Sequence, residues 1–156
     1  MPKKFTDEEY AAMLPKKQIG TAVLLFNEKN ELLIVKPDYK ESWLVPGGVV
    51  DHDESPLSCA LRETEEEVGL TFSTLQLVGI YYGPRKGIFT DSLKFIFAGG
   101  VLNDDQISRI ELQEDELQEF RFLSVEKALP YLSSSLQKSI PACLEAMAKG
   151  SVAYIE

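Results

Sequence analysis

Hydrophobic and polar positions alternate along the chain in a pattern that predicts strands interleaved with helices. The predicted strands are apolar and rich in β-branched or aromatic residues, and turn-forming residues separate them. They cover 18–26, 31–35, 74–82, 92–98 and 120–123. The first two flank the turn residues 27–30 and therefore predict a β-hairpin. Gly99 and Gly100 predict a turn or a bulge after the fourth strand.

The best-defined helix is expected between Ser55 and Gly69. Ser55 suits the N-cap, Pro56 suits the first helical position, and Gly69 suits the position that follows the last turn. Small or apolar residues recur at helical spacing between them, and we expect them to face the core. These residues are Leu57, Ala60, Leu61, Thr64 and Val68.

Three further helical segments complete the predicted fold. They are a short helix or arm within 1–16, a helix over 125–132, and a helix over 141–149 with Pro141 in its first turn. The chain has 156 residues and shows no internal repeat or linker, so we expect a single domain over 1–156. The order of elements predicts an α+β or α/β class, in which helices flank a mixed sheet.

Charge and composition limit the partners of the protein. The formal net charge of −9 argues against binding to a nucleic-acid polymer or to an anionic membrane surface, because either would need a basic face. No apolar run is long enough to span a membrane, and no signal peptide is visible, so we expect a cytoplasmic protein. Cys59 and Cys143 are expected to be reduced, buried thiols. The sequence leaves a homodimer open.

An acidic run dominates the segment around the best-defined helix. Glu63, Glu66 and Glu67 are related as i, i+3 and i+4, so they share one helix face that lies off the apolar stripe. Such a face either contacts water or holds cations. Converging carboxylates suit a hard divalent cation, which commonly joins carboxylates to the phosphates of a substrate. Gly47 and Gly48, which precede the helix, allow a ligand to approach the main chain.

The spacing of these residues resembles the Nudix box, G-x5-E-x7-R-E-U-x-E-E-x-G-U, where U is aliphatic. The matching positions are Gly48, Glu54, Arg62, Glu63, Glu66, Glu67, Gly69 and Leu70. Thr64 is the one departure, because the family usually has an aliphatic residue there. The box spans residues 48–70, which is 23 of the 156 residues, and the preceding segment 43–48 is also Nudix-like. The resemblance implies an α/β/α sandwich of Nudix type, with the box as a loop–helix–loop.

The resemblance also implies a chemistry for the acidic face. A Nudix hydrolase uses Mg²⁺, with Mn²⁺ as a substitute, to cleave the diphosphate of a nucleoside diphosphate linked to another moiety. Its substrate here would be a nucleotide sugar such as ADP-ribose, or a (d)NTP. By match to the motif, Glu63, Glu66, Glu67 and the Gly48 carbonyl would hold metal. A non-catalytic Nudix-like module that senses a nucleotide is the alternative.

The same resemblance implies roles for residues around these ligands. Arg62 would brace the box by pairing with Glu54 or Glu66. A further acid from a later loop often serves the family as metal ligand or general base, commonly six positions before an aromatic residue. Glu116 precedes Phe122 by six and is our choice, with Glu114, Asp115 and Glu119 as alternatives.

Two basic residues lie in the loop between the third and fourth predicted strands. Arg85 and Lys86 could bind a terminal phosphate or a sugar of the substrate if this loop overhangs the site. Simple surface charge explains them equally well.

Overall fold

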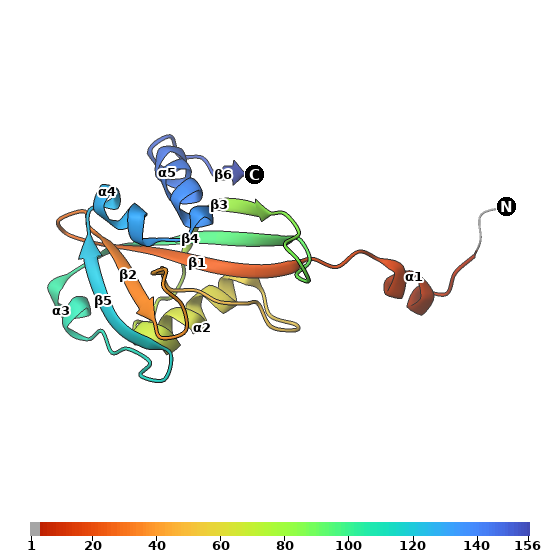
Figure 1. Ribbon diagram of the computed structural model, residues 1–156, viewed down its shortest axis with the longest axis horizontal. Coiled ribbons are helices and arrows are strands. Elements are labelled where there is room, and N and C mark those ends of the chain that lie inside the picture. The colour runs from red at the N-terminus through yellow and green to blue at the C-terminus, as the bar shows by residue number, and fades with distance from the viewer. Residues whose placement is uncertain (1–3) are drawn as a thin grey trace.

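A computed structural model describes residues 4–156, so the first three residues of the predicted N-terminal helix or arm lie outside it. Six strands form one sheet in the order β5-β2-β1-β4-β3-β6 (Figure 1). They are β1 (Gln18–Asn27), β2 (Leu32–Pro37), β3 (Gln76–Gly83), β4 (Ser92–Leu102), β5 (Leu117–Leu123) and β6 (Ala153–Ile155). β1 pairs parallel with β4 and antiparallel with β2, so the sheet is mixed, as predicted.

Helices cover both faces of this sheet. The helical segments within residues 4–156 are α1 (Asp7–Met13), α2 (Pro56–Val68), α3 (Asp104–Ser108), α4 (Val125–Ala128), the 3₁₀ turn η1 (Leu129–Tyr131) and α5 (Ser134–Ala148). Figure 1 shows α2 on one face and α4 and α5 on the other, which confirms the predicted α+β sandwich. Each face has its own apolar core, one around Val23, Val35 and Val68, the other around Leu24, Ile96 and Ile140.

The predicted boundaries of α2 are confirmed. The Ser55 side chain accepts a hydrogen bond from the Ser58 N–H at 3.1 Å, and Pro56 opens the helix. Gly69 ends it in the left-handed conformation with φ of 74°. Thr64 is fully buried, and its hydroxyl donates to the Ala60 carbonyl at 2.7 Å, so the one departure from the Nudix pattern is accommodated within the helix.

Local signals misplaced part of the C-terminal region. Pro141 lies inside α5, not in the first turn of a helix, because Leu136 and Ile140 bury against the sheet and extend the helix toward its N-terminus. The predicted helix over 125–132 forms as α4 followed by η1. The sequence pattern predicts neither the helix α3 nor the strand β6.

The Gly99-Gly100 pair forms a bulge within β4. Leu24 pairs with Ala98 and Phe26 with Val101, so Leu25 alone faces the two glycines. Gly100 adopts a left-handed φ of 76°. The strand therefore continues past the pair to Leu102.

The chain ends differ in how they are tied to the sheet. The C-terminal β6 pairs with β3, whereas α1 lies apart from the sheet and buries no residue (Figure 1). None of the helices within residues 4–156 is long and apolar enough to cross a membrane. Cys59 and Cys143 are buried free thiols, as predicted.

Candidate active site

The glycine loop before α2 lies against strand β1. The Gly48 carbonyl accepts hydrogen bonds from the Thr21 N–H at 2.8 Å and the Thr21 hydroxyl at 3.4 Å, and the Gly48 N–H donates to that hydroxyl at 3.3 Å. A side chain at Gly47 would collide with the backbone of β1, and one at Gly48 would displace the carboxylate of Glu63. A Cβ on Gly47 would lie 2.1 Å from the Thr21 carbonyl oxygen, and one on Gly48 would lie 2.3 Å from a Glu63 carboxylate oxygen. The loop therefore fits between β1 and the acidic face of α2.

Arg62 joins the carboxylates of that face. Its Nε and Nη2 donate to the two oxygens of Glu54 at 2.8 and 3.0 Å. Its Nη1 donates to Glu63 at 2.9 Å and to Glu66 at 3.1 Å. This bidentate contact holds the pKa of Glu54 at about 2, and the carboxylates raise the pKa of Arg62 above its ordinary value. Arg62 pairs with both of the carboxylates that the resemblance offered it.

Glu67 is the most buried carboxylate of the group, with 8% of its surface exposed. It accepts one hydrogen bond, from the Gly47 N–H at 3.1 Å. Burial first, and then the nearby charges of Glu63 and Glu116, raise its pKa to about 8, although the Gly47 hydrogen bond opposes them. A buried carboxylate with so little compensation favours a cation beside it.

These residues fit a hard divalent cation by their chemistry. Within residues 4–156, no three histidine, cysteine, aspartate or glutamate side chains are already grouped as ligands of one metal ion. Arg62 binds the carboxylates of Glu63 and Glu66. The oxygens of Glu63, Glu67 and the Gly48 carbonyl are nevertheless the ligand type that Mg²⁺ prefers, and Glu63 packs directly over Gly48.

Glu116 belongs to a loop that is tied to the end of α2. The Gln113 N–H donates to the Glu67 carbonyl at 3.1 Å, and the Glu116 N–H donates to the Gln113 carbonyl at 3.1 Å. From the other side, the Asp38 N–H donates to the Glu116 carbonyl at 3.0 Å. Among the four acids weighed from the sequence, Glu116 is the one whose charge raises the pKa of both Glu63 and Glu67.

The basic loop lies elsewhere. Arg85 lines a polar pocket of about 370 Å³ together with Lys16 and Lys17, and no residue of the box lines that pocket. Lys86 forms a backbone bridge with Phe89. Arg85 therefore lies in a pocket that the box does not line, and Lys86 is not among the residues that line it.

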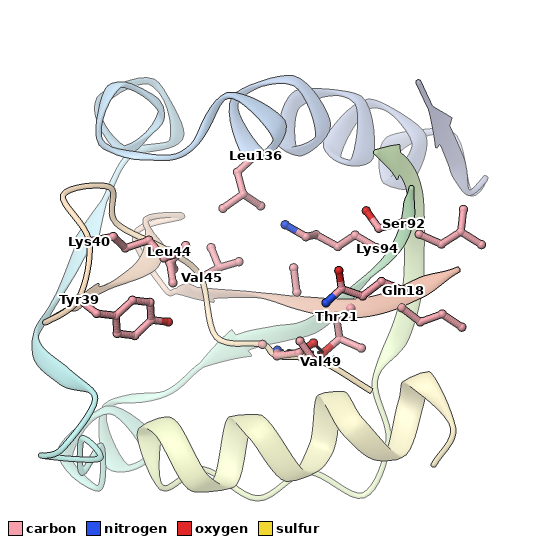
Figure 2. Close-up of a pocket in the computed structure, with 16 residues that line it drawn as sticks. Gln18, Thr21, Tyr39, Lys40, Leu44, Val45, Val49, Ser92, Lys94 and Leu136 are labelled. Carbon is pink, nitrogen blue, oxygen red and sulfur yellow. Dashed lines mark hydrogen bonds between the residues drawn. The ribbon is translucent and has the colours of Figure 1, made fainter. Parts of the chain in front are cut away.

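A larger pocket of about 430 Å³ adjoins the glycine loop (Figure 2). Gly47 and Gly48 form one wall, and β1, β4, α5 and the loop after β2 form the rest. No motif in the sequence points to the polar side chains that line it, namely Gln18, Thr21, Tyr39, Lys40, Ser92 and Lys94. A signal for Lys94 was present, because strand alternation places it on the same face as the buried Ile96 and Ala98.

The comparison with protein families is decisive. The family model for the NUDIX domain matches residues 16–143. The chain belongs to the NUDIX family. The predicted family is thereby confirmed, and the match includes the box, the glycine loop and most of α5.

Related NUDIX proteins carry several names. Over 130 residues the chain is 31% identical to an uncharacterized Nudix hydrolase of Pseudomonas aeruginosa, covering 76% of this chain and 73% of that protein. Over 119 residues it is 31% identical to an ADP-ribose pyrophosphatase of Bacillus subtilis, covering 74% and 63%. Over 87 residues it is 30% identical to a MutT-like protein of Streptomyces ambofaciens, covering 56% of each. The chain thus spans about half the length of this last relative.

Solved structures of the family have the same fold. A MutT protein from Methanosarcina mazei Go1 superposes with a TM-score of 0.69 at 26% identity, over 85% of this chain and 96% of that one. A UDP-X diphosphatase gives a TM-score of 0.71 at 21% identity, over 98% and 76%. The names among these relatives agree with the predicted class of enzyme, a hydrolase of phosphorus-containing anhydrides.

Proposed function

We propose that this NUDIX protein hydrolyses the diphosphate of a nucleoside diphosphate linked to another moiety, or of a (d)NTP, with Mg²⁺ as cofactor. One observation carries the proposal. The acidic face of α2 packs against the glycine loop, and the other side of that loop lines a pocket of about 430 Å³. A diphosphate at the acidic face would then leave room for the rest of a nucleotide in the pocket.

The proposed ligands of the cation are the carboxylates of Glu63, Glu66 and Glu67 and the carbonyl of Gly48. Bound Mg²⁺ would offset the negative charge of the diphosphate and favour ionisation of a water molecule. Glu67 supports this assignment most strongly, because its buried carboxylate has a single hydrogen-bond partner within residues 4–156. Glu63 and Glu66 are paired with Arg62, so cation binding has to compete with that guanidinium.

Arg62 and Glu54 would act as positioning residues. Their bidentate pair links the loop before α2 to its second turn and so fixes the direction in which the acidic face points. The Gly47 N–H then fixes Glu67 from the loop side. The proposed site is therefore held on a helix and braced from both sides, as a catalytic site requires.

Hydrolysis needs a water oxygen to attack one phosphorus while the bridging P–O bond breaks. The products are a nucleoside monophosphate and either a phosphorylated remainder or pyrophosphate. Glu116 is our candidate to take the proton from the water, because it is exposed and its charge acts on both Glu63 and Glu67.

The name of one relative bears on the substrate. An ADP-ribose pyrophosphatase of Bacillus subtilis shares 31% identity over 119 residues, which supports a nucleotide sugar as the substrate. Arg85 and Lys86 remain proposed contacts for a terminal phosphate or sugar of a longer substrate. Neither of them lines the pocket beside the glycine loop, so we expect them to contribute less to substrate binding than the residues around Gly48.

A substrate panel with matched variants tests this proposal. The wild-type protein should release a nucleoside monophosphate from ADP-ribose, another nucleotide sugar or a (d)NTP with Mg²⁺, and chelation by EDTA should abolish the reaction. Glu67→Gln should lower kcat at least about 100-fold, since loss of even an outer-shell partner costs roughly 10- to 100-fold. Glu65→Gln is the matched control, because Glu65 lies on the same helix but is exposed.

Two results would contradict the proposal. One is the absence of turnover for every member of the panel although thermal shifts show that a nucleotide binds, which would favour the non-catalytic sensor. The other is equal activity of Glu67→Gln and Glu65→Gln, which would remove the acidic face from the chemistry.

A further inference from the structure

Lys94 extends from β4 into the pocket beside the glycine loop. Figure 2 shows its side chain crossing the pocket with the ammonium group below Leu136 of α5. On the sheet, Lys94 lies between Gly20 of β1 and Tyr81 of β3. Because Gly20 has no side chain, the pocket is open beside the stem of Lys94.

The position of Lys94 is unusual for a lysine. Strand alternation places it in line with Ile96 and Ala98, which are buried in the core beneath α5. Ala22 of β1 belongs to the same core. The pocket is therefore the open end of an apolar core, and Lys94 places a cation where the pattern of the strand calls for an apolar side chain.

Nothing in the described structure compensates this charge. Within residues 4–156, Lys94 forms no side-chain hydrogen bond and no ion pair. The residues that line the pocket include a second lysine, Lys40, and no carboxylate. Burial lowers the pKa of the Lys94 ammonium, and the charge of Lys40 lowers it further.

An ammonium group has three donors and no acceptor, so it needs an oxygen or nitrogen acceptor from outside the chain. A partly buried cation without a partner also costs stability, and a methionine of similar length would fit the same apolar surroundings at less cost. The side chain is thus poorly explained by folding and well explained by a ligand.

The geometry points to Lys94 as a specificity-determining residue, which binds an oxygen acceptor on the part of the substrate that fills this pocket. This inference rests on the proposed function, because the diphosphate at the acidic face directs the rest of the nucleotide over Gly47 and Gly48. Two sources can supply the acceptor, namely a carbonyl of the nucleobase or an oxygen of the phosphates. The apolar walls formed by Val45 and Leu136 suit a planar base.

Inosine and adenosine nucleotides separate the two sources, because they differ at one ring position, where inosine carries a carbonyl and adenosine an amino group. We would measure the affinities of IDP and ADP by calorimetry, which needs no turnover, and kcat/KM for ITP and ATP in parallel. The variants are Lys94→Met and, as a matched control, Lys127→Met, since Lys127 is exposed on α4.

We expect Lys94→Met to weaken IDP binding about 10- to 100-fold, the effect of losing one charge-assisted hydrogen bond, with kcat largely unchanged and KM raised. A loss confined to the inosine nucleotides assigns the contact to a base carbonyl. An equal loss for both nucleotides assigns it to a phosphate oxygen. The unfolding midpoint should not fall, which separates a lost ligand contact from structural damage.

Unchanged affinities in Lys94→Met would overturn the inference, even if the wild type hydrolyses nucleotides and the proposed function stands. Failure of the wild type to bind either diphosphate would also overturn it. The converse result is distinguishable as well. If the wild type binds IDP, and loses it on Lys94→Met, but hydrolyses nothing, then the inference stands and the proposed function fails.

Discussion

The two sides of the glycine loop treat charge in opposite ways. On one side, Arg62 pairs with Glu54, Glu63 and Glu66, and the Gly47 N–H binds Glu67. On the other side, Lys94 has no partner within residues 4–156, and no carboxylate lines its pocket. Tyr39 links the two sides, because it lines the pocket while the charges of Glu67 and Glu116 add to burial in raising its pKa.

This difference indicates which part of a substrate each side is suited to bind. The acidic side is organised by its own ion pairs before a ligand binds. The lysine side is incomplete until a ligand brings an acceptor, so it can discriminate between ligands. One site would then combine a fixed region for the diphosphate with a selective region for the remainder.

Among these variants, the largest loss of activity and stability is expected when the ion pairs of Arg62 on the acidic side are removed. Arg62→Met leaves Glu54 and Glu63 without their cation, so kcat should fall about 10- to 100-fold and the thermal unfolding midpoint should fall as well. Activity assays and differential scanning fluorimetry measure the two effects. Arg109→Met is the control, since its ion pair with Asp105 is exposed and includes no residue of the box. Equal midpoints for both variants would show that the Arg62 network does not brace the loop.

A smaller loss of stability and activity is expected when the contact between Thr21 of β1 and the glycine loop is removed. Thr21→Val keeps the shape of the buried side chain but removes the hydroxyl that contacts the Gly48 N–H and carbonyl. We expect a loss of ~1 kcal/mol in the free energy of unfolding and about 10-fold in kcat. Thr21→Ser should restore both quantities, and urea denaturation together with initial rates would show it. Full activity in Thr21→Val would mean that the loop needs no help from β1.

The Arg62–Glu54 pair predicts a distinct response to acid. The folded-state pKa of Glu54 is about 2, below its ordinary value of 4.5, so the pair stabilises the protein above about pH 4.5. That contribution is lost as the pH falls toward 2, because Glu54 then takes up a proton. Glu54→Gln should lack this part of the pH dependence in urea titrations between pH 5 and pH 2. The prediction fails if the two proteins lose stability in parallel over that range.

The smallest effect on the free energy of unfolding is expected for Lys94, and it is an increase instead of a decrease. Lys94→Met removes a charge that has no partner, so the free energy of unfolding should stay the same or rise by up to about 1 kcal/mol. The comparison with Arg62→Met in the same urea titration decides the matter. A decrease for Lys94→Met as large as that for Arg62→Met would show that Lys94 is part of the structure's own network.

The sequence predicts the organised side well because its signals are local. Ser55, Pro56 and Gly69 define α2 through capping and backbone preferences that depend on few neighbours. The spacing of Glu63, Glu66 and Glu67 then places them on one face whatever the rest of the fold does. Spacing alone does not decide whether this face contacts water or holds cations. The resemblance to the Nudix box favours cations.

The pocket around Lys94 is harder to predict, because it is formed by contacts between residues that are distant in sequence. Lys94 matters only because Gly20, Leu136 and the loop around Lys40 surround it, and these come from three separate elements. β6 is similar, since three residues form a strand only where β3 offers an edge. Pro141 was misplaced because burial of the preceding turn outweighs the usual preference of proline for a first turn.

Mn²⁺ binding tests the central claim most directly, because it requires neither a substrate nor turnover. It is measured by the decrease in the electron paramagnetic resonance signal of free Mn²⁺. The account predicts that the wild type and Glu65→Gln bind Mn²⁺ with equal affinity. Glu67→Gln should bind it at least about 10-fold more weakly. Equal binding by all three proteins would contradict the assignment of the acidic face of α2 as the cation site.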